Sequence, residues 1–235
     1  MPIDAVPDHV AVAVPDIEAA AARWRDHLGG GWLAPTMRSE SAGFASRQLR
    51  YPGGAKLELL EPVGDDGFAT RFLHRLGARI HHVTLKVPAL LPAVEQLRDE
   101  GFDVVDVFAE GEMWHEAFLR PSQVGGLIVQ IAWAGHSDEQ FAALFDTVPE
   151  EPSSDAAILH GPSLVHPDLS AAGAVWSTLG AEVVEADGGL DVSWHDAPLT
   201  VRIDRGDPAS AVGVRFTGCA PLEQDPKLGA ATLPG

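Results

Sequence analysis

Apolar positions in the first part of the chain follow one spacing typical of strands and another typical of helices. Residues 9–14 alternate small and β-branched side chains and end at Pro15, which predicts a strand followed by a turn. Residues 17–28 are rich in alanine and run into three glycines, which predicts a helix with a glycine stop. Short strands are predicted after it at residues 32–33, 46–51 and 56–60. The first unit is therefore β-α-β-β-β.

The same order of elements returns further along the chain. His82 and Pro88 each stand 73 residues after His9 and Pro15, their counterparts in the first copy. A helix is predicted over 91–100, closed by a glycine. Strands follow at residues 103–108, 116–119 and 127–132. Two copies at a nearly constant offset form an internal repeat.

A third, weaker copy follows an acidic linker rich in proline and serine. Residues 163–169 restate residues 12–17, and a helix is predicted over 171–179. The places of His9 and Glu58 fall at Gly161 and near Arg202, so this copy has no metal ligands. We expect four parts, which are a two-module metal-binding domain over 1–135, a linker over 136–155, a metal-free half-module over 156–220 and a loose tail over 221–235.

An unpaired half-module leaves an apolar face and a strand edge that need cover. We expect residues 156–220 to pack on the first two copies or to pair with their twin in a homodimer.

Composition narrows the classes of partner. With 34 acidic and 16 basic residues, the formal charge of −18 disfavours nucleic acids and anionic membranes. The single cysteine permits no internal disulfide, and the N-terminus lacks the pattern of a signal peptide. No apolar run approaches the roughly 20 residues of a membrane span. We expect a cytoplasmic protein, and abundant Ala, Gly and Pro with few lysines favour a bacterial source.

Polar residues at equivalent places in the first two copies suggest the chemistry. His9 and His82 open the first strands, and Glu58 and Gln130 sit in the last strands, which are otherwise apolar. If the two copies face each other about a pseudo-twofold axis, these side chains converge. Two imidazoles, a carboxylate and an amide oxygen suit one divalent cation, such as zinc, nickel, cobalt, manganese or iron. The alternative is that each residue is a hydrogen-bonded structural residue.

Several short motifs appear together in a recognisable order. They are Asp8-His9-Val10, residues 56–62, His81-His82-Val83, residues 118–121 and Gly126-Leu127-Ile128. Residues 4–134 thereby resemble the glyoxalase and methylmalonyl-CoA epimerase branch of the vicinal oxygen chelate superfamily. The resemblance implies an α+β fold in which paired βαβββ modules form a cupped mixed sheet around a divalent metal. It also implies a substrate that chelates this metal through adjacent oxygens.

Two departures from the epimerases concern the catalytic bases. In that branch the last metal ligand is a glutamate that also acts as a base, whereas this chain has Gln130, which cannot take up a proton. The second catalytic glutamate of the branch corresponds to Ser46. Glu116 is the repeat mate of Ser46 and shares a strand face with Phe118. We expect Glu116, or else Glu58, to be the base; the alternative for Glu116 is a solvated edge-strand carboxylate.

These observations lead to one main hypothesis and two alternatives. The main hypothesis is a metal-dependent isomerase, epimerase or lyase that acts on a small carbonyl compound, such as an acyl thioester, through an enolate-like intermediate. The alternatives are a ring-cleaving non-haem iron dioxygenase and a non-catalytic ligand-sequestering protein. The sequence names neither the substrate nor the metal. The residues expected to contact the substrate are Ser46, Gln48, Trp114, His115 and Phe118.

Overall fold

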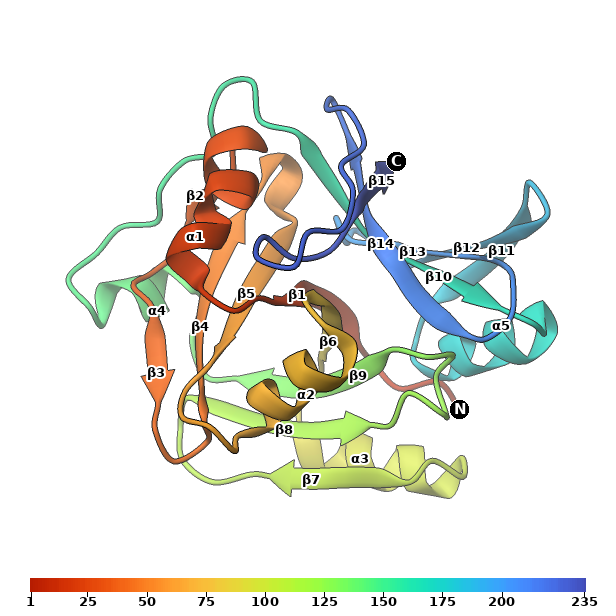
Figure 1. Cartoon of the computed structure of the whole chain (residues 1–235). Helices are drawn as coiled ribbons and strands as arrows, with labels where there is room; N and C mark the ends of the chain where they lie inside the picture. The colour runs from red at the N-terminus through yellow and green to blue at the C-terminus, as the bar shows by residue number, and fades with distance from the viewer. The chain divides into compact units, whose positions relative to one another are not determined.

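Two mixed sheets and a few short helices make up the computed structural model, which describes all 235 residues (Figure 1). The first sheet has nine strands in the order β2-β4-β5-β1-β6-β9-β8-β7, with β3 paired to β4. Its strands are β1 (Val6–Ala13), β2 (Gly31–Trp32), β3 (Met37–Ser39), β4 (Phe44–Arg50), β5 (Lys56–Pro62), β6 (Arg79–Lys86), β7 (Val104–Phe108), β8 (Trp114–Leu119) and β9 (Ile128–Ala134). The α+β fold with paired modules is therefore confirmed.

The second sheet has six strands in the order β11-β12-β13-β10-β14-β15. They are β10 (Ile158–His166), β11 (Glu182–Ala186), β12 (Gly189–Ser193), β13 (Val201–Arg205), β14 (Ser210–Thr217) and β15 (Thr232–Pro234). The helices of the chain are α1 (Ile17–Ala21) with its π-helical continuation η1 (Ala22–His27), the 3-10 turn η2 (Pro52–Gly54), α2 (Phe68–Leu76), α3 (Leu90–Asp99), α4 (Asp138–Ala143) and α5 (Leu169–Thr178). No helix is long and apolar enough to cross a membrane.

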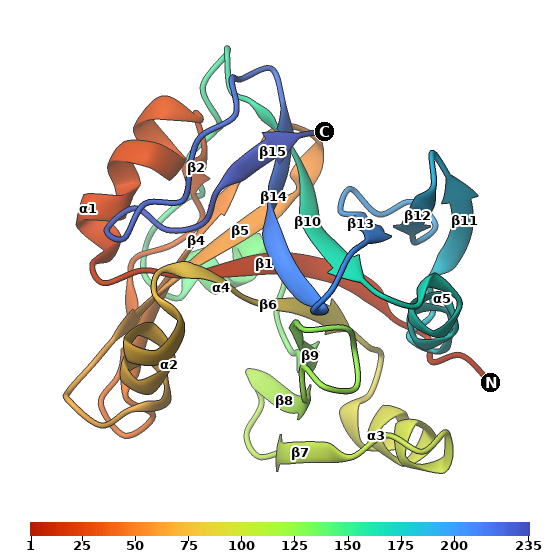
Figure 2. The ribbon, with the colours of Figure 1, turned by 45° about the vertical axis from the view of Figure 1, so that its right-hand side comes forward.

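The repeated units share one connectivity. In the second copy β6 pairs in parallel with β9, and in the third copy β10 pairs in parallel with β13. Helix α3 packs on β7, β8 and β9, and α5 packs on β11, β12 and β13 (Figure 2). In the second and third copies a strand and a helix are followed by three further strands, and the first copy has the additional short strand β3. In each copy the last strand returns beside the first. Helix α2, which lies between the first two repeats, was not expected from the sequence.

The chain divides into two compact units. One combines Met1–His9, His82–Gly135 and Gly161–Val212, and the other combines Val10–His81, His136–His160 and Gly213–Gly235. The core of the second unit includes Trp24, Tyr51 and Phe216, all at most 1% exposed, and the Tyr51 hydroxyl donates to the Trp24 carbonyl at 2.6 Å. The domain boundaries expected near residues 135 and 155 stay a prediction, which limited proteolysis can test.

The C-terminal segment is not the loose tail expected from the sequence. Strand β15 pairs in parallel with β14, and Thr232 is 1% exposed. The Arg23 guanidinium donates to the Ala230 carbonyl at 2.7 Å, and the Trp24 indole donates to the Leu228 carbonyl at 2.7 Å. Burial lowers the pKa of Arg23. The expectation was wrong because these partners lie some 200 residues away, beyond the reach of local sequence patterns.

The three glycines after η1 allow the linker to pack closely against the chain. The amide of Ser153 donates to the Gly29 carbonyl at 2.9 Å, and the amide of Glu150 donates to the Trp32 carbonyl at 2.7 Å. A Cβ added to Gly31 would lie 2.4 Å from the Glu150 carbonyl oxygen. The linker backbone lies too close to Gly29 and Gly31 for a side chain at either position. These glycines therefore end the helix and also make room for the linker.

Gly31→Ala is expected to lower the free energy of unfolding by about 1–3 kcal/mol, because its methyl group must displace the linker backbone. Gly173→Ala is the matched control, since its Cβ would meet only side chains at 3.4 Å or more and alanine favours helix α5. Urea unfolding followed by tryptophan fluorescence measures both. Equal midpoints for the two variants would contradict the close contact at Gly31.

Candidate functional site

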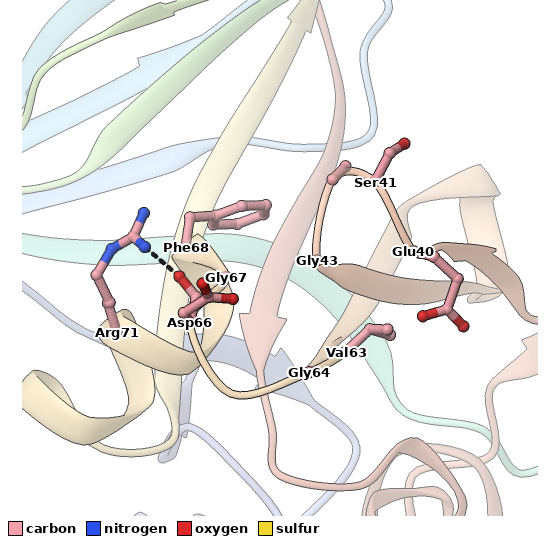
Figure 3. Close-up of a pocket in the computed structure, with 10 residues that line it drawn as sticks. Glu40, Ser41, Gly43, Val63, Gly64, Asp66, Gly67, Phe68 and Arg71 are labelled. Carbon is pink, nitrogen blue, oxygen red and sulfur yellow. Dashed lines mark hydrogen bonds between the residues drawn. The ribbon is translucent and has the colours of Figure 1, made fainter.

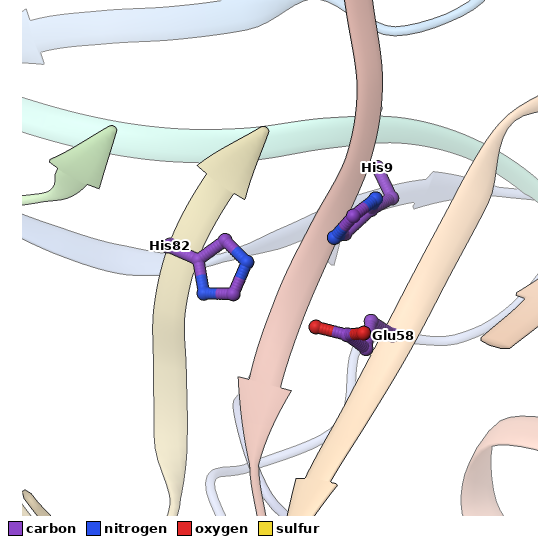
Figure 4. A group of neighbouring side chains, drawn as sticks. All are labelled: His9, Glu58 and His82. Carbon is purple, nitrogen blue, oxygen red and sulfur yellow. The ribbon is translucent and has the colours of Figure 1, made fainter. Parts of the chain in front are cut away.

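Two histidines and one glutamate come together from three strands of the first sheet. His9 lies on β1, His82 on β6 and Glu58 on β5. Each offers one ligand atom, and these atoms all lie within 4.8 Å of one another (Figure 4). His9 and His82 are 1% and 5% exposed, and their rings meet edge to face at 5.6 Å. Such mixed nitrogen and oxygen donors suit a divalent transition metal.

The orientation of His9 is fixed by a buried carboxylate. The Nδ1 atom of His9 lies 2.7 Å from Asp8 Oδ2, and the other oxygen of Asp8 lies 2.7 Å from Lys86 Nζ. The Asp8 side chain is 8% exposed. In metal sites a carboxylate on one ring nitrogen commonly holds the histidine with its other nitrogen toward the ion. Asp8 and Lys86 therefore support His9 as a ligand through Nε2.

A chain of hydrogen bonds leads from His9 to Glu116. His9 Nε2 lies 3.0 Å from the Thr84 hydroxyl, which donates to Gln130 Oε1 at 2.5 Å. The Gln130 amide nitrogen donates to Glu116 Oε2 at 2.7 Å, and the Trp114 indole donates to the same oxygen at 3.0 Å. Glu116 is thus tied to the histidine cluster and is not an isolated solvated carboxylate.

Strand register shows that the two copies place equivalent residues in equivalent positions. Gln48 stands opposite Glu58 in the β4–β5 hairpin, and Phe118 stands opposite Gln130 in the β8–β9 hairpin. Two residues earlier on β4 and β8 come Ser46 and Glu116, as the repeat predicts. Side chains directly opposite in an antiparallel pair share a face. Ser46 and Gln48 therefore share the face of Glu58, and Phe118 shares that of Gln130.

One residue expected at the site lies elsewhere. His115 falls between Trp114 and Glu116 on β8, so strand alternation turns it to the opposite face. Its Nε2 lies 2.8 Å from the Gly111 carbonyl oxygen, and its ring centroid lies 4.6 Å from that of Trp133. His115 is not among the side chains that the structure gathers around Gln130.

His81 also has a structural setting. Its ring centroid lies 4.5 Å from that of Phe72 and 5.6 Å from that of Phe68. Burial lowers the pKa of His81 to about 4, although the Glu58 carboxylate acts in the opposite direction. His81 is therefore neutral at pH 7 and packs with aromatic rings, whereas its neighbour His82 joins His9 and Glu58 in the cluster that could hold a metal.

Sequence reasoning missed the supporting residues Asp8, Thr84 and Lys86. Alternation along β6 puts His82, Thr84 and Lys86 on one face, and Thr84 is fully buried. Two signals in the sequence could have revealed them. Thr84 is a polar residue two places after the predicted ligand His82 in an apolar strand, and Asp8 directly precedes the predicted ligand His9.

A separate pocket of about 390 Å³ opens at the start of α2 (Figure 3). Its lining residues come from two loops and the first turn of the helix and include Glu40, Gly43, Gly67, Phe68 and Arg71. The Arg71 guanidinium donates to the Asp66 carbonyl at its rim. None of the residues expected to bind metal or substrate lines this pocket.

Comparison with known proteins supports one family. Residues 8–118 match the model described as Glyoxalase/Bleomycin resistance protein/Dioxygenase superfamily. The chain is similar to an ethylmalonyl-CoA/methylmalonyl-CoA epimerase of Cereibacter sphaeroides, with 34% identity over 130 residues, covering 53% of this chain and 94% of the relative. It is 33% identical to the mitochondrial methylmalonyl-CoA epimerase of Mus musculus, covering 54% and 72% of the two chains.

Solved structures extend the likeness to the whole fold. Methylmalonyl-CoA epimerase from Mycobacterium tuberculosis superposes with a TM-score of 0.50 at 24% identity, over 55% of this chain and 87% of that one. A hypothetical protein from Staphylococcus aureus superposes with a TM-score of 0.69 at 12% identity, over 98% and 99% of the two chains. The fold of this chain, including its second sheet, thus has a counterpart in another solved structure. This chain is a member of the glyoxalase/bleomycin resistance protein/dioxygenase superfamily.

Proposed function

We propose that this protein is a divalent-metal-dependent isomerase or epimerase that moves a proton next to the carbonyl of an acyl thioester. The observation that carries the proposal is the cluster of His9, Glu58 and His82, whose ligand atoms lie within 4.8 Å of one another. Family membership and the named epimerase relatives support the reaction class.

The donor set fits a metal ion. His9, His82 and Glu58 would hold it, and Gln130 Oε1, which the Thr84 hydroxyl links to His9, is the proposed fourth ligand. A bound cation would supply Lewis-acid polarisation of a carbonyl oxygen, worth several kcal/mol of the barrier to proton removal. A site with mixed nitrogen and oxygen ligands accepts zinc, nickel, cobalt, manganese or iron.

Proton transfer is assigned to carboxylates. Glu116 is half-buried and held at Oε2 by two N–H donors, so it has a fixed position and access to solvent. A positioned carboxylate acts as a general base, whereas the Gln130 amide cannot. Glu58 is the second candidate because it belongs to the cluster itself.

The substrate class follows from the relatives and from the residues near these carboxylates. The relatives are named for ethylmalonyl-CoA and methylmalonyl-CoA, whose acyl groups offer two adjacent oxygens to a metal. Phe118 shares the face of Gln130 and would contact the acyl group, and Ser46 and Gln48 share the face of Glu58. We propose a small branched acyl thioester as the substrate.

One observation favours a second candidate function. The cluster of His9, Glu58 and His82 consists of two histidines and one carboxylate. That set is also the facial triad of non-haem iron(II) oxygenases. Iron as the native metal, together with oxygen consumption, would favour this function over proton transfer.

The first prediction concerns metal content. The wild-type protein is expected to bind about one divalent ion per chain, and His9→Ala/His82→Ala is expected to bind none, because two of the proposed ligands are lost. Elemental analysis after purification and metal loading measures both. His74→Ala removes an exposed histidine of α2 and should bind like the wild type. A folded wild type that takes up no metal would refute the proposal.

The second prediction concerns the support of His9. Asp8→Asn is expected to weaken zinc binding by about 10–100-fold, because it removes the carboxylate that orients His9. Competition with a chromogenic chelator gives the dissociation constant. Asp4→Asn, at an exposed position, is the control. Unchanged affinity in Asp8→Asn would mean that His9 does not depend on Asp8.

The third prediction concerns the base. Glu116→Gln is expected to lower turnover by about 10²–10⁴-fold while metal content stays the same. Mass spectrometry of deuterium incorporation at C2 of methylmalonyl-CoA and ethylmalonyl-CoA in D₂O follows the reaction. Glu95→Gln on α3, an exposed glutamate, should react at the wild-type rate. Full exchange in Glu116→Gln would leave Glu58 as the base.

A further inference from the structure

Glu116 is held in an unusual way for a carboxylate on a sheet near its edge. Two N–H groups from different residues donate to the same oxygen, Gln130 Nε2 at 2.7 Å and Trp114 Nε1 at 3.0 Å. Trp114 stands two residues before Glu116 on β8 and shares its face, and Gln130 reaches it from the neighbouring β9. Two donors on one oxygen fix both the position and the rotation of the carboxyl group.

The side chain of Gln130 uses both ends of its amide. Its oxygen accepts from Thr84, which leads back to His9, while its nitrogen donates to Glu116. A carboxylate at this place could accept from Thr84 but could donate nothing, and it would put a second negative charge against Glu116. The amide of Gln130 serves both neighbours.

Burial along this network decreases toward Glu116. Thr84 is fully buried and Gln130 is 6% exposed, whereas Trp114 and Glu116 are half-buried. The buried end is rigid because its polar groups are paired in a close-packed interior. Lys86 Nζ lies 5.7 Å from the centroid of the Trp114 ring, which adds a contact on the ring face.

We propose that Gln130 and Trp114 are positioning residues that set Glu116 for proton transfer, and that Gln130 links this carboxylate to the metal-binding histidine. The positioning role in catalysis rests on the proposed function, whereas the hydrogen bonds themselves do not.

The hydrogen bonds can be tested without any substrate or metal. The chain has six tryptophans, and the indole N–H signal of Trp114 in a ¹H–¹⁵N spectrum is identified by its loss in Trp114→Phe. Glu116→Gln should move this signal upfield, because a neutral acceptor replaces a charged one. The side-chain amide signals of Gln130, identified by their loss in Gln130→Glu, should move as well. Glu95→Gln should move neither.

The positioning role is tested by deuterium exchange into methylmalonyl-CoA. Trp114→Phe keeps the ring and loses the donor. It is expected to lower kcat at least about tenfold and to leave KM within about twofold, because a hydrogen bond to a charged group is lost and the substrate contacts remain. In the Glu116→Gln background, Trp114→Phe should cause no further loss of kcat.

Two results would overturn the proposal. One is an indole signal of Trp114 that Glu116→Gln leaves in place, which would show that the hydrogen bond does not form. The other is an equal loss of kcat from Trp114→Phe with and without Glu116, which would indicate a merely structural tryptophan. A third result separates the two proposals. If the wild type exchanges no deuterium but Glu116→Gln still moves its Trp114 indole signal, the proposed function is refuted and the hydrogen bond to Glu116 stands.

Discussion

Parallel pairing between the first and last strand of a repeat determines which side chains meet in this protein. In the second copy the pairing of β6 with β9 puts Thr84 beside Gln130, and strand alternation then places His82 and Lys86 on the face of Thr84. A slip of one residue would turn all of these side chains to the other face. Because the strands are apolar elsewhere and well buried, such a slip would expose the core, so the same burial that stabilises the sheet also keeps the polar residues in register.

Polar groups so deeply buried impose a second requirement, since each must find a partner or lose stability. Asp8 illustrates it, because its carboxylate is shared between His9 and Lys86 with little exposure to water. The charge of Asp8 is balanced by Lys86, and the same carboxylate holds the imidazole of His9 in place. The position of His9 in the cluster thus depends on Asp8 and Lys86, which are not members of the cluster themselves.

The sequence was sufficient for the features that a repeat can reveal. The offset between His9 and His82 predicted equivalent strands, and the strand registers confirm the match of Ser46 with Glu116. It was insufficient where contacts are long-range. The docking of the C-terminal segment on Arg23 and Trp24 could not be seen in local composition, and the order of hydrogen bonds through Thr84 depends on side-chain conformations that only packing decides.

The third repeat carries an instructive substitution. Its register sets Ser163 opposite Arg202, where the second repeat has Thr84 opposite Gln130. Arg202 lies 3.1 Å from an oxygen of Asp191 and 2.7 Å from one of Asp204. A guanidinium thus balances nearby carboxylates with a charge that is part of the chain. The third repeat therefore neutralises two carboxylates of its own at the position where the neutral Gln130 of the second repeat donates to the carboxylate of Glu116.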